Sequence, residues 1–166
     1  MGKEVKTNAM RILDRAKVSY RFYTYEPGDK VDGITVASKM GQPLERVYKT
    51  LVTRGKSGGY FVFVIPVAAG LDLKRATKAV GEKSVQMIHV KEINQITGYI
   101  RGGCSPIGMK KQFPTVVSSS AEELPTIIVS GGRIGTQVEL DPHTLVKLVR
   151  GTFADIESEE PITDGG

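Results

Sequence analysis

Residues 46–67 read RVYKTLVTRGKSGGYFVFVIPV, and this stretch predicts the centre of a β-sheet. Its first half alternates, so that Val47, Lys49 and Leu51 share one face of a strand. The KSGG that follows predicts a hairpin turn, and the nearly continuous apolar run at 60–67 is typical of a buried central strand. Lys49 therefore shares its face with two apolar residues, which is an unusual environment for an ammonium group.

Patterns on both sides of this hairpin predict further elements. Residues with good capping chemistry mark helices at 7–17 (N-cap Thr7), 36–40 (N-cap Thr35, stopped by Gly41), 73–80 (Asp72 to Gly81), 91–97 (ended by Gly98) and 142–149 (N-cap Asp141). Period-2 or β-branched runs predict strands at 19–25, 46–54, 60–67, 85–88, 114–117, 126–130 and 137–140, with SGGRIG as a glycine-rich hairpin connection.

Strands outnumber helices, and several are joined by tight turns. This predicts an α+β fold: a single domain with a mixed, largely antiparallel, partly closed barrel-like sheet flanked by helices. We expect the domain to span residues 1–157 and the acidic residues 158–166 to form a flexible tail.

The composition is that of an ordinary globular protein, with 40% hydrophobic and 25% charged residues among 166. Long apolar runs and an apolar signal-peptide core are absent from the sequence, and one cysteine, Cys104, cannot form an intramolecular disulfide. We therefore expect a cytoplasmic protein without membrane contact. The net charge of +5 favours a polyanionic partner, although ordinary solubility explains it equally well.

The sequence contains no motif typical of a metal site or of a nucleotide-binding P-loop. One cysteine, His89 and His143 lack metal-ligand spacing, and no GxxxxGK[ST] loop occurs. We expect neither a metal nor another cofactor.

A second notable stretch is GYIRGGCSPIGMKK at residues 98–111. Gly102 and Gly103 allow positive φ or close backbone approach, and Pro106 makes the loop rigid, so the loop can present N–H groups to an oxygen atom. The serine-hydrolase alternative fails because the spacing is GxSxxG and Pro106 lacks the N–H that an oxyanion hole needs. We interpret Ser105 as structural, and Cys104 as a buried or half-buried thiol without a nearby base.

Four ordered motifs resemble one known family. VYKTL (47–51), LDLKRATKAVG (71–81), TGYIRGGCSPIGMKK (97–111) and IIVSGGRIG (127–135) resemble the YbaK family of cysteinyl-tRNA(Pro) deacylases, over roughly residues 5 to 156. That family is similar to the inserted editing domain of bacterial prolyl-tRNA synthetases. The resemblance implies a mixed, partly closed sheet and the removal of cysteine from mischarged tRNA(Pro), and conceivably from tRNA(Cys), by a free-standing protein. The implied partners are the 3′ end of aminoacylated tRNA and a prolyl-tRNA synthetase.

The resemblance also implies the site residues. It places the family's essential lysine on Lys49, a tyrosine on Tyr25, a loop glycine on Gly102 and a turn serine on Ser130. The expected catalytic group is Lys49, Gly102 and Gly103, and the expected substrate-binding group is Tyr25, Ser105, Pro106, Ile107, Gly108, Ser130 and Gly131. Cys104 and Arg101 depart from the aliphatic residues that the family leads us to expect.

The implied mechanism is attack by the cysteinyl thiolate on its own ester, which releases the tRNA and a thiolactone. Lys49 would favour the thiolate or anchor the substrate, and N–H groups near Gly102, Gly103 and Ile107 would receive the oxyanion. Two alternatives stay open: a broader deacylase for alanyl and seryl esters that uses water, and a non-catalytic module that binds aminoacyl-tRNA or a synthetase.

Overall fold

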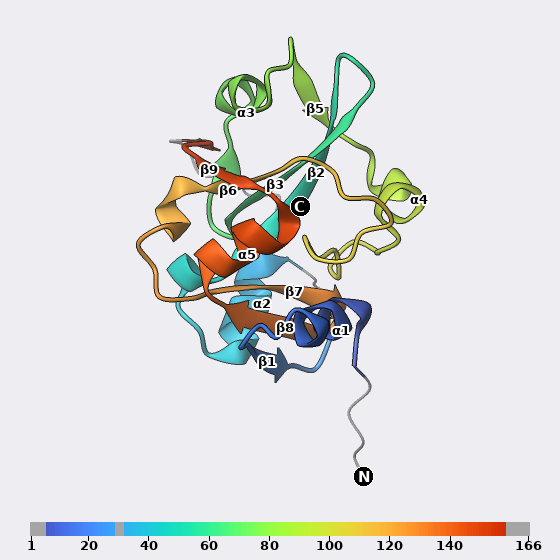
Figure 1. The fold of residues 1–166 in the computed structure, drawn as a ribbon. Helices are drawn as coiled ribbons and strands as arrows, with labels where there is room; N and C mark the ends of the chain where they lie inside the picture. Colours follow the sequence, from blue (N-terminus) through green and yellow to red (C-terminus); the bar gives the residue numbers. More distant parts are fainter. Residues whose placement is uncertain (1–5, 29–31, 159–166) are drawn as a thin grey trace.

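The computed structural model describes residues 6–28 and 32–158, which form helices packed around mixed β-sheets (Figure 1). The α-helices are α1 (Asn8–Arg15), α2 (Gly33–Met40), α3 (Leu73–Val80), α4 (Ile93–Thr97) and α5 (Pro142–Val149). Short 3₁₀ helices lie at η1 (Leu44–Arg46), η2 (Val90–Glu92) and η3 (Ser119–Ala121). The strands are β1 (Arg21–Thr24), β2 (Tyr48–Gly55), β3 (Tyr60–Pro66), β4 (Gly70–Leu71), β5 (Val85–Met87), β6 (Thr115–Ser118), β7 (Ile127–Arg133), β8 (Thr136–Leu140), β9 (Thr152–Ala154) and β10 (Glu157–Ser158).

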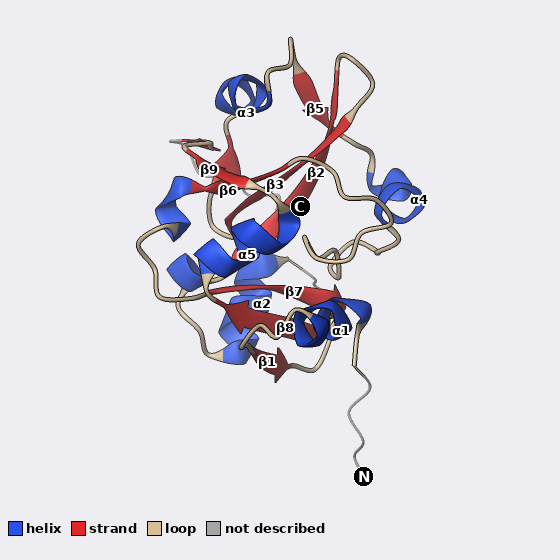
Figure 2. Cartoon of the chain, viewed as in Figure 1, coloured by secondary structure: helices blue, strands red, loops and turns tan. Residues whose placement is uncertain are grey.

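The predicted hairpin is the centre of the larger sheet. β2 and β3 pair antiparallel from Tyr48↔Pro66 to Arg54↔Tyr60, and the sheet order is β5-β2-β3-β6-β9. The pairs of β6 with β3 and with β9 are parallel, whereas β5 joins β2 antiparallel. β1, β8 and β7 form a separate antiparallel sheet (Figure 2). β10 pairs antiparallel with β4. The predicted α+β class with mixed, largely antiparallel pairing is confirmed.

The single barrel-like sheet that we expected is divided. Among the described residues, the two larger sheets meet at one bridge, Val47↔Ile128, which is parallel. β5 covers β2 only from Thr53 to Gly55. The part of β2 between the bridge and β5 therefore keeps an open edge, since neither neighbouring strand continues along it.

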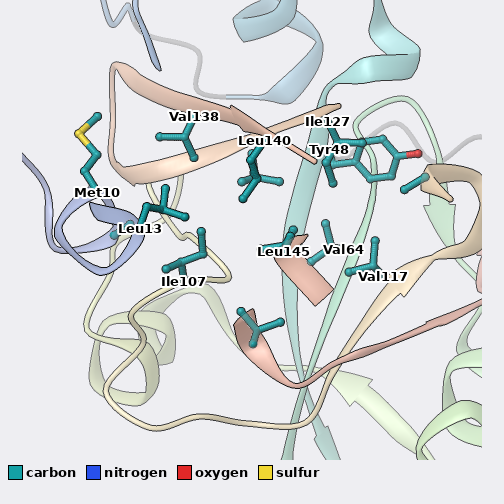
Figure 3. Close-up of a cluster of buried hydrophobic side chains, with 14 residues drawn as sticks. Met10, Leu13, Tyr48, Val64, Ile107, Val117, Ile127, Val138, Leu140 and Leu145 are labelled. Carbon is teal, nitrogen blue, oxygen red and sulfur yellow. The ribbon is translucent and has the colours of Figure 1, made fainter. Parts of the chain in front are cut away.

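Three groups of buried side chains hold the sheets and helices together. The largest packs α1 and α5 between the two sheets and includes Ile107 from the loop after α4 (Figure 3). A second, with Leu51, Phe63 and Leu71, covers the opposite face of the larger sheet beneath α3. A small third cluster, Ala37, Val47, Val67 and Ile128, seats α2 beside the bridge.

Three local predictions need correction. Helix α2 begins at Gly33 with Asp32 as its N-cap, because the Asp32 carboxylate accepts the Thr35 N–H at 2.9 Å and leaves Thr35 inside the helix. SGGRIG is not wholly a turn, since β7 continues to Arg133 through an irregular register after Ser130. The short strands β4, β9 and β10 were not predicted, because two or three residues carry too little periodicity.

Two negative findings concern the described residues. No helix in the described ranges is long and apolar enough to span a membrane. Within residues 6–28 and 32–158, no three histidine, cysteine or acidic side chains gather in a way that would hold a metal ion. Most of the predicted acidic tail, residues 159–166, lies outside the described residues.

Candidate active site

A cavity of about 520 Å³ runs along the open edge of β2. Its polar wall combines Lys49 and Thr50 of β2, Arg101, Gly102 and Cys104 of the loop, Ser130 of β7 and Gln137 of β8. The rest of its lining comes from Gly33, Val36, Val47, Tyr48, Leu51, Val52, Val67, Gly70, Leu71, Leu73, Met87, Ile88, Val90 and Ile93. Lys49 lies between Val47 and Leu51 along the strand, as the alternation of the sequence predicts.

Strand register explains why three of the polar residues meet. Val47 is bridged in parallel to Ile128, so two residues further along each strand come Lys49 and Ser130. Ser130 is in turn paired with Gln137 across β7 and β8. Lys49, Ser130 and Gln137 thus form a row across three neighbouring strands, and all three line the cavity.

The loop contributes Gly102 to the cavity with a backbone that favours glycine. Its φ is +89°, which is a conformation that other residues rarely adopt. Gly103 is buried behind it, and its N–H donates to the Ile100 carbonyl at 2.9 Å. The Ile107 N–H donates to Ser105 Oγ at 3.2 Å. Two of the three N–H groups expected to receive an oxyanion are therefore occupied, and Gly102 carries the one for which no such bond is formed among the described residues.

The segment after Gly102 is a buried support rather than a lining. Ser105, Pro106 and Ile107 are all buried, and Ile107 packs in the largest core. Tyr99 Oη donates to the Ile107 carbonyl at 2.5 Å, and Gly108 has a φ of +83° that lets it pack against Tyr99. These side chains are not among the cavity-lining residues, so we expect them to hold the loop in place.

Two other predicted site residues also lie outside the cavity wall. Tyr25 follows β1, and its N–H donates to the Gly135 carbonyl at 3.0 Å, beside the β7–β8 turn. Gly131 is buried, where a Cβ would lie 3.0 Å from the methyl group of Thr136. The structure brings together Lys49, Gly102 and Ser130 from the predicted set.

Cys104 lines the cavity as a protonated thiol. Burial raises the pKa of Cys104 to about 11, and a hydrogen bond involving Thr97 offsets only part of this. The group is therefore a poor nucleophile near neutral pH. This agrees with the interpretation drawn from its sequence context.

Sequence reasoning missed two polar residues of the wall, Gln137 and Thr50. Gln137 had a usable signal, because the predicted strands 126–130 and 137–140 flank one hairpin connection, which puts Gln137 opposite the predicted site residue Ser130. Thr50 lies on the face of β2 opposite Lys49, and its Oγ1 is buried without a hydrogen-bond partner among the described residues. No pattern in the sequence indicates an unpaired hydroxyl of this kind.

Comparison with known proteins identifies the class that this fold and cavity define. Residues 30–148 match the aminoacyl-tRNA editing domain family. The chain belongs to this family, whose members are deacylases that hydrolyse the ester bond of aminoacyl-tRNA. The predicted resemblance is thereby confirmed.

Individual relatives agree with this assignment. The chain is 47% identical over 156 residues to the "Putative Cys-tRNA(Pro)/Cys-tRNA(Cys) deacylase EbsC" of Enterococcus faecalis, covering 93% of this chain and 95% of the relative. A solved structure described as a "putative trans-editing enzyme for prolyl tRNA synthetase" superposes with a TM-score of 0.77 at 21% identity, over 93% of this chain and 99% of the other. A hypothetical protein of known structure gives a TM-score of 0.84 at 21% identity, over 92% and 100%. At these identities the two structures support the fold.

Proposed function

We propose that this protein is a trans-editing deacylase that removes cysteine from mischarged Cys-tRNA(Pro), and from Cys-tRNA(Cys) where that ester reaches it. The observation that carries the proposal is the cavity itself. It brings Lys49, Gly102 and Ser130 to one wall beside the open edge of β2. The family and the substrates named for the Enterococcus faecalis relative support the same activity.

The chemistry of the wall favours a nucleophile that belongs to the substrate. The described lining residues contain neither histidine nor carboxylate, and Cys104 is protonated near neutral pH. Ser130 Oγ accepts the Gly132 N–H at 3.2 Å and has no general base beside it among those residues. A cysteinyl ester supplies the missing thiol.

In the proposed reaction the cysteinyl S–H loses its proton, and sulfur bonds to the carbonyl carbon of the same aminoacyl group. The carbon–oxygen bond to the tRNA ribose then breaks, the proton passes to the departing ribose oxygen, and the resulting thiolactone is hydrolysed by water to cysteine. Lys49 stabilises the thiolate, and the Gly102 N–H receives the developing oxyanion. The protein supplies position and charge, and the substrate supplies the nucleophile.

The test compares esters that differ at one atom. Cysteinyl-, seryl- and alanyl-tRNA(Pro) should be incubated with the enzyme in parallel, and the thiolactone should be trapped or detected by mass spectrometry. We expect rapid release from the cysteinyl ester with a transient thiolactone. Equal rates for all three esters would instead indicate attack by water and a broader deacylase.

The same assay tests partners and the non-catalytic alternative. Cys-tRNA(Pro) and Cys-tRNA(Cys) should be compared with and without prolyl-tRNA synthetase, because a partner can impose tRNA selectivity on a small domain. We expect the synthetase to favour release from tRNA(Pro). Binding of both tRNAs without release of labelled cysteine would contradict the proposed activity and support a binding module.

A further inference from the structure

We propose that Gln137 binds the α-amino group of the aminoacyl ester and so makes the cavity selective for α-amino acyl groups. This inference rests on the proposed function, because it names a second recognition group in the same cavity. Gln137 lies at one end of the Lys49–Ser130–Gln137 row, and Lys49 lies at the other end.

The state of the Gln137 side chain is the first reason. Gln137 is 6% exposed and lines the cavity, yet its amide forms no hydrogen bond with another residue of the described ranges. Among the described residues, Thr50 Oγ1 is the side-chain atom that is enclosed without a partner, so the Gln137 amide is accessible from the cavity rather than sealed in the core. An amide that lines a cavity and has no protein partner among the described residues is available to a polar group that enters the cavity.

The neighbours of Gln137 do not satisfy it, although they are close. Tyr23 is paired with Gln137 on β1, but its hydroxyl donates to Glu139. Ser130 is paired with Gln137 on β7, and its oxygen accepts the Gly132 N–H. Neither neighbour forms a hydrogen bond with the Gln137 amide among the described residues, so the amide is open to a ligand.

Charge decides which part of the ligand Gln137 meets. Lys49 is cationic, so it attracts the thiolate and disfavours a protonated amine beside it. Gln137 lies two strands away, so the Lys49 ammonium group and the Gln137 amide reach the cavity from different strands. Among the described lining residues, no carboxylate is present to receive an ammonium group. The neutral carbonyl oxygen of Gln137 is thus the acceptor best placed for the amine, and it binds the amine whether or not the amine is protonated.

The test removes the amine and the amide separately. Cysteinyl-tRNA(Pro) is compared with 3-mercaptopropionyl-tRNA(Pro), which lacks only the α-amino group, in the wild type and in Gln137→Leu. We expect the wild type to prefer the cysteinyl ester by about 10- to 100-fold in kcat/KM, the scale of one buried hydrogen bond. Gln137→Leu should lose this preference by slowing on the cysteinyl ester and should keep the wild-type rate on the analogue.

Stability separates recognition from a structural role. Because the Gln137 amide is unpaired in the folded protein, Gln137→Leu should unfold at the same or a higher urea concentration. Gln86→Leu is the matched control, since Gln86 is exposed on β5 and does not line the cavity. It should change neither the preference nor the rates. Equal slowing of Gln137→Leu on both esters, or an unchanged preference, would overturn the proposal.

Binding measurements keep this inference distinct from the proposed function. A non-hydrolysable cysteinyl amide of 3′-amino-3′-deoxyadenosine and its des-amino counterpart can be titrated by calorimetry. Tighter binding of the amine-bearing analogue, lost in Gln137→Leu, supports the role of Gln137 even if the wild type releases no cysteine. Equal binding of the two analogues by the wild type refutes it even if deacylation is fast.

Discussion

At the scale of single residues, Lys49 owes its place in the cavity to an edge that two strands leave uncovered. β5 pairs with β2 only as far as Thr53↔Met87, and among the described residues the two larger sheets are bridged at Val47, just before β2 begins. Lys49 lies between these points, on the same strand face as Val47 and Leu51. A strand lysine on an apolar face would otherwise extend toward water, and at the open edge its side chain lines the cavity instead.

Replacement of Lys49 by Ala is expected to slow deacylation of Cys-tRNA(Pro) by about 100-fold or more, the scale of losing one group that stabilises the transition state. The fold should persist, because Lys49 is only partly buried. Single-turnover rates and circular dichroism provide the measurement. Lys78→Ala, on the exposed side of α3, is the control and should retain wild-type turnover. Near-wild-type turnover of folded Lys49→Ala would remove Lys49 from the mechanism.

Cys104→Ser is expected to retain activity within about threefold, because a thiol with its pKa raised to about 11 is protonated and does not attack the ester. The pH profile of kcat/KM is the sharper measurement. A nucleophilic thiolate at Cys104 would show as a rise in the enzymatic rate with pH that the serine variant lacks. If Cys104→Ser abolishes deacylation while it still binds substrate, the proposed substrate-assisted reaction is wrong.

The residues of the loop show how far sequence can predict a site. The resemblance predicts site residues in the segment from Gly102 to Gly108, but it does not state which of them line the cavity, and only Gly102 and Cys104 do. That depends on Ile107, which is fully buried in the core and turns Ser105 and Pro106 inward with it. Gln137 was missed because the role proposed for it depends on which hydrogen bonds its neighbours form, and those are not visible in the sequence.

At the scale of elements, the loop and the β7–β8 hairpin are locked by backbone contact. A Cβ on Gly103 would lie 2.9 Å from the Ile134 nitrogen and 3.1 Å from the Arg133 carbonyl carbon. The sequence can indicate that a glycine is needed at position 103. It cannot indicate which element packs against this glycine, because the contact joins segments thirty residues apart. The register of the hairpin and the position of Gly102 are therefore coupled through this contact.

Gly103→Ala is expected to destabilise the protein by about 1–3 kcal/mol, as overpacking against backbone generally does. Urea unfolding measures the loss. Gly59→Ala is the control, because a Cβ there meets its nearest atoms at 3.6 Å, an ordinary contact, and it should shift stability by less than about 0.5 kcal/mol. If Gly103→Ala and Gly59→Ala were equally stable, the contact between Gly103 and the β7–β8 hairpin would contribute nothing to the free energy of unfolding.

A second link between elements is the Glu139 carboxylate of β8. The hydroxyls of Tyr23 and Thr126 donate to it, and Arg46 of η1 forms an ion pair with it at 3.1 Å. Burial alone would raise the pKa of Glu139, but the hydrogen bonds from Thr126 and Tyr23 and the charge of Arg46 outweigh it, so the pKa lies below its usual value. This group joins β1, η1 and the β7–β8 hairpin.

The lowered pKa of Glu139 determines how its contribution to the stability of the folded protein changes with pH. Its stabilising contribution is complete above the pKa of the unfolded chain, about 4.3, and is lost as the pH falls through the folded-state pKa. Glu139→Gln should therefore be about 1–2 kcal/mol less stable than the wild type near neutral pH, and the difference should shrink in acid. Urea unfolding across pH measures it, with exposed Glu123→Gln as the control. A difference that grows in acid would contradict the assignment.

At the scale of the whole molecule, the division into two sheets is what creates the cavity. The sequence predicted most helices and strands, since their capping residues and alternation are local. It did not predict that β7 would meet β2 at one bridge, because that contact depends on how α2 and its small core seat beside Val47. A fully closed sheet would have covered the edge on which Lys49 and Thr50 lie.

The net charge of +5 belongs to the same scale, and it predicts how the protein meets a long polyanion. Arg101 lines the cavity, and Lys110 and Lys111 follow on the same loop as exposed residues. If two phosphates are contacted, KM for Cys-tRNA(Pro) should rise about tenfold between about 50 and about 200 mM salt. Cysteine ethyl ester, which has no phosphate, should show no such rise, and Arg101→Ala should lower the salt slope by about one phosphate contact. An equal salt effect on both esters would mean that salt acts on the protein itself, and tRNA docking through this loop would then be excluded.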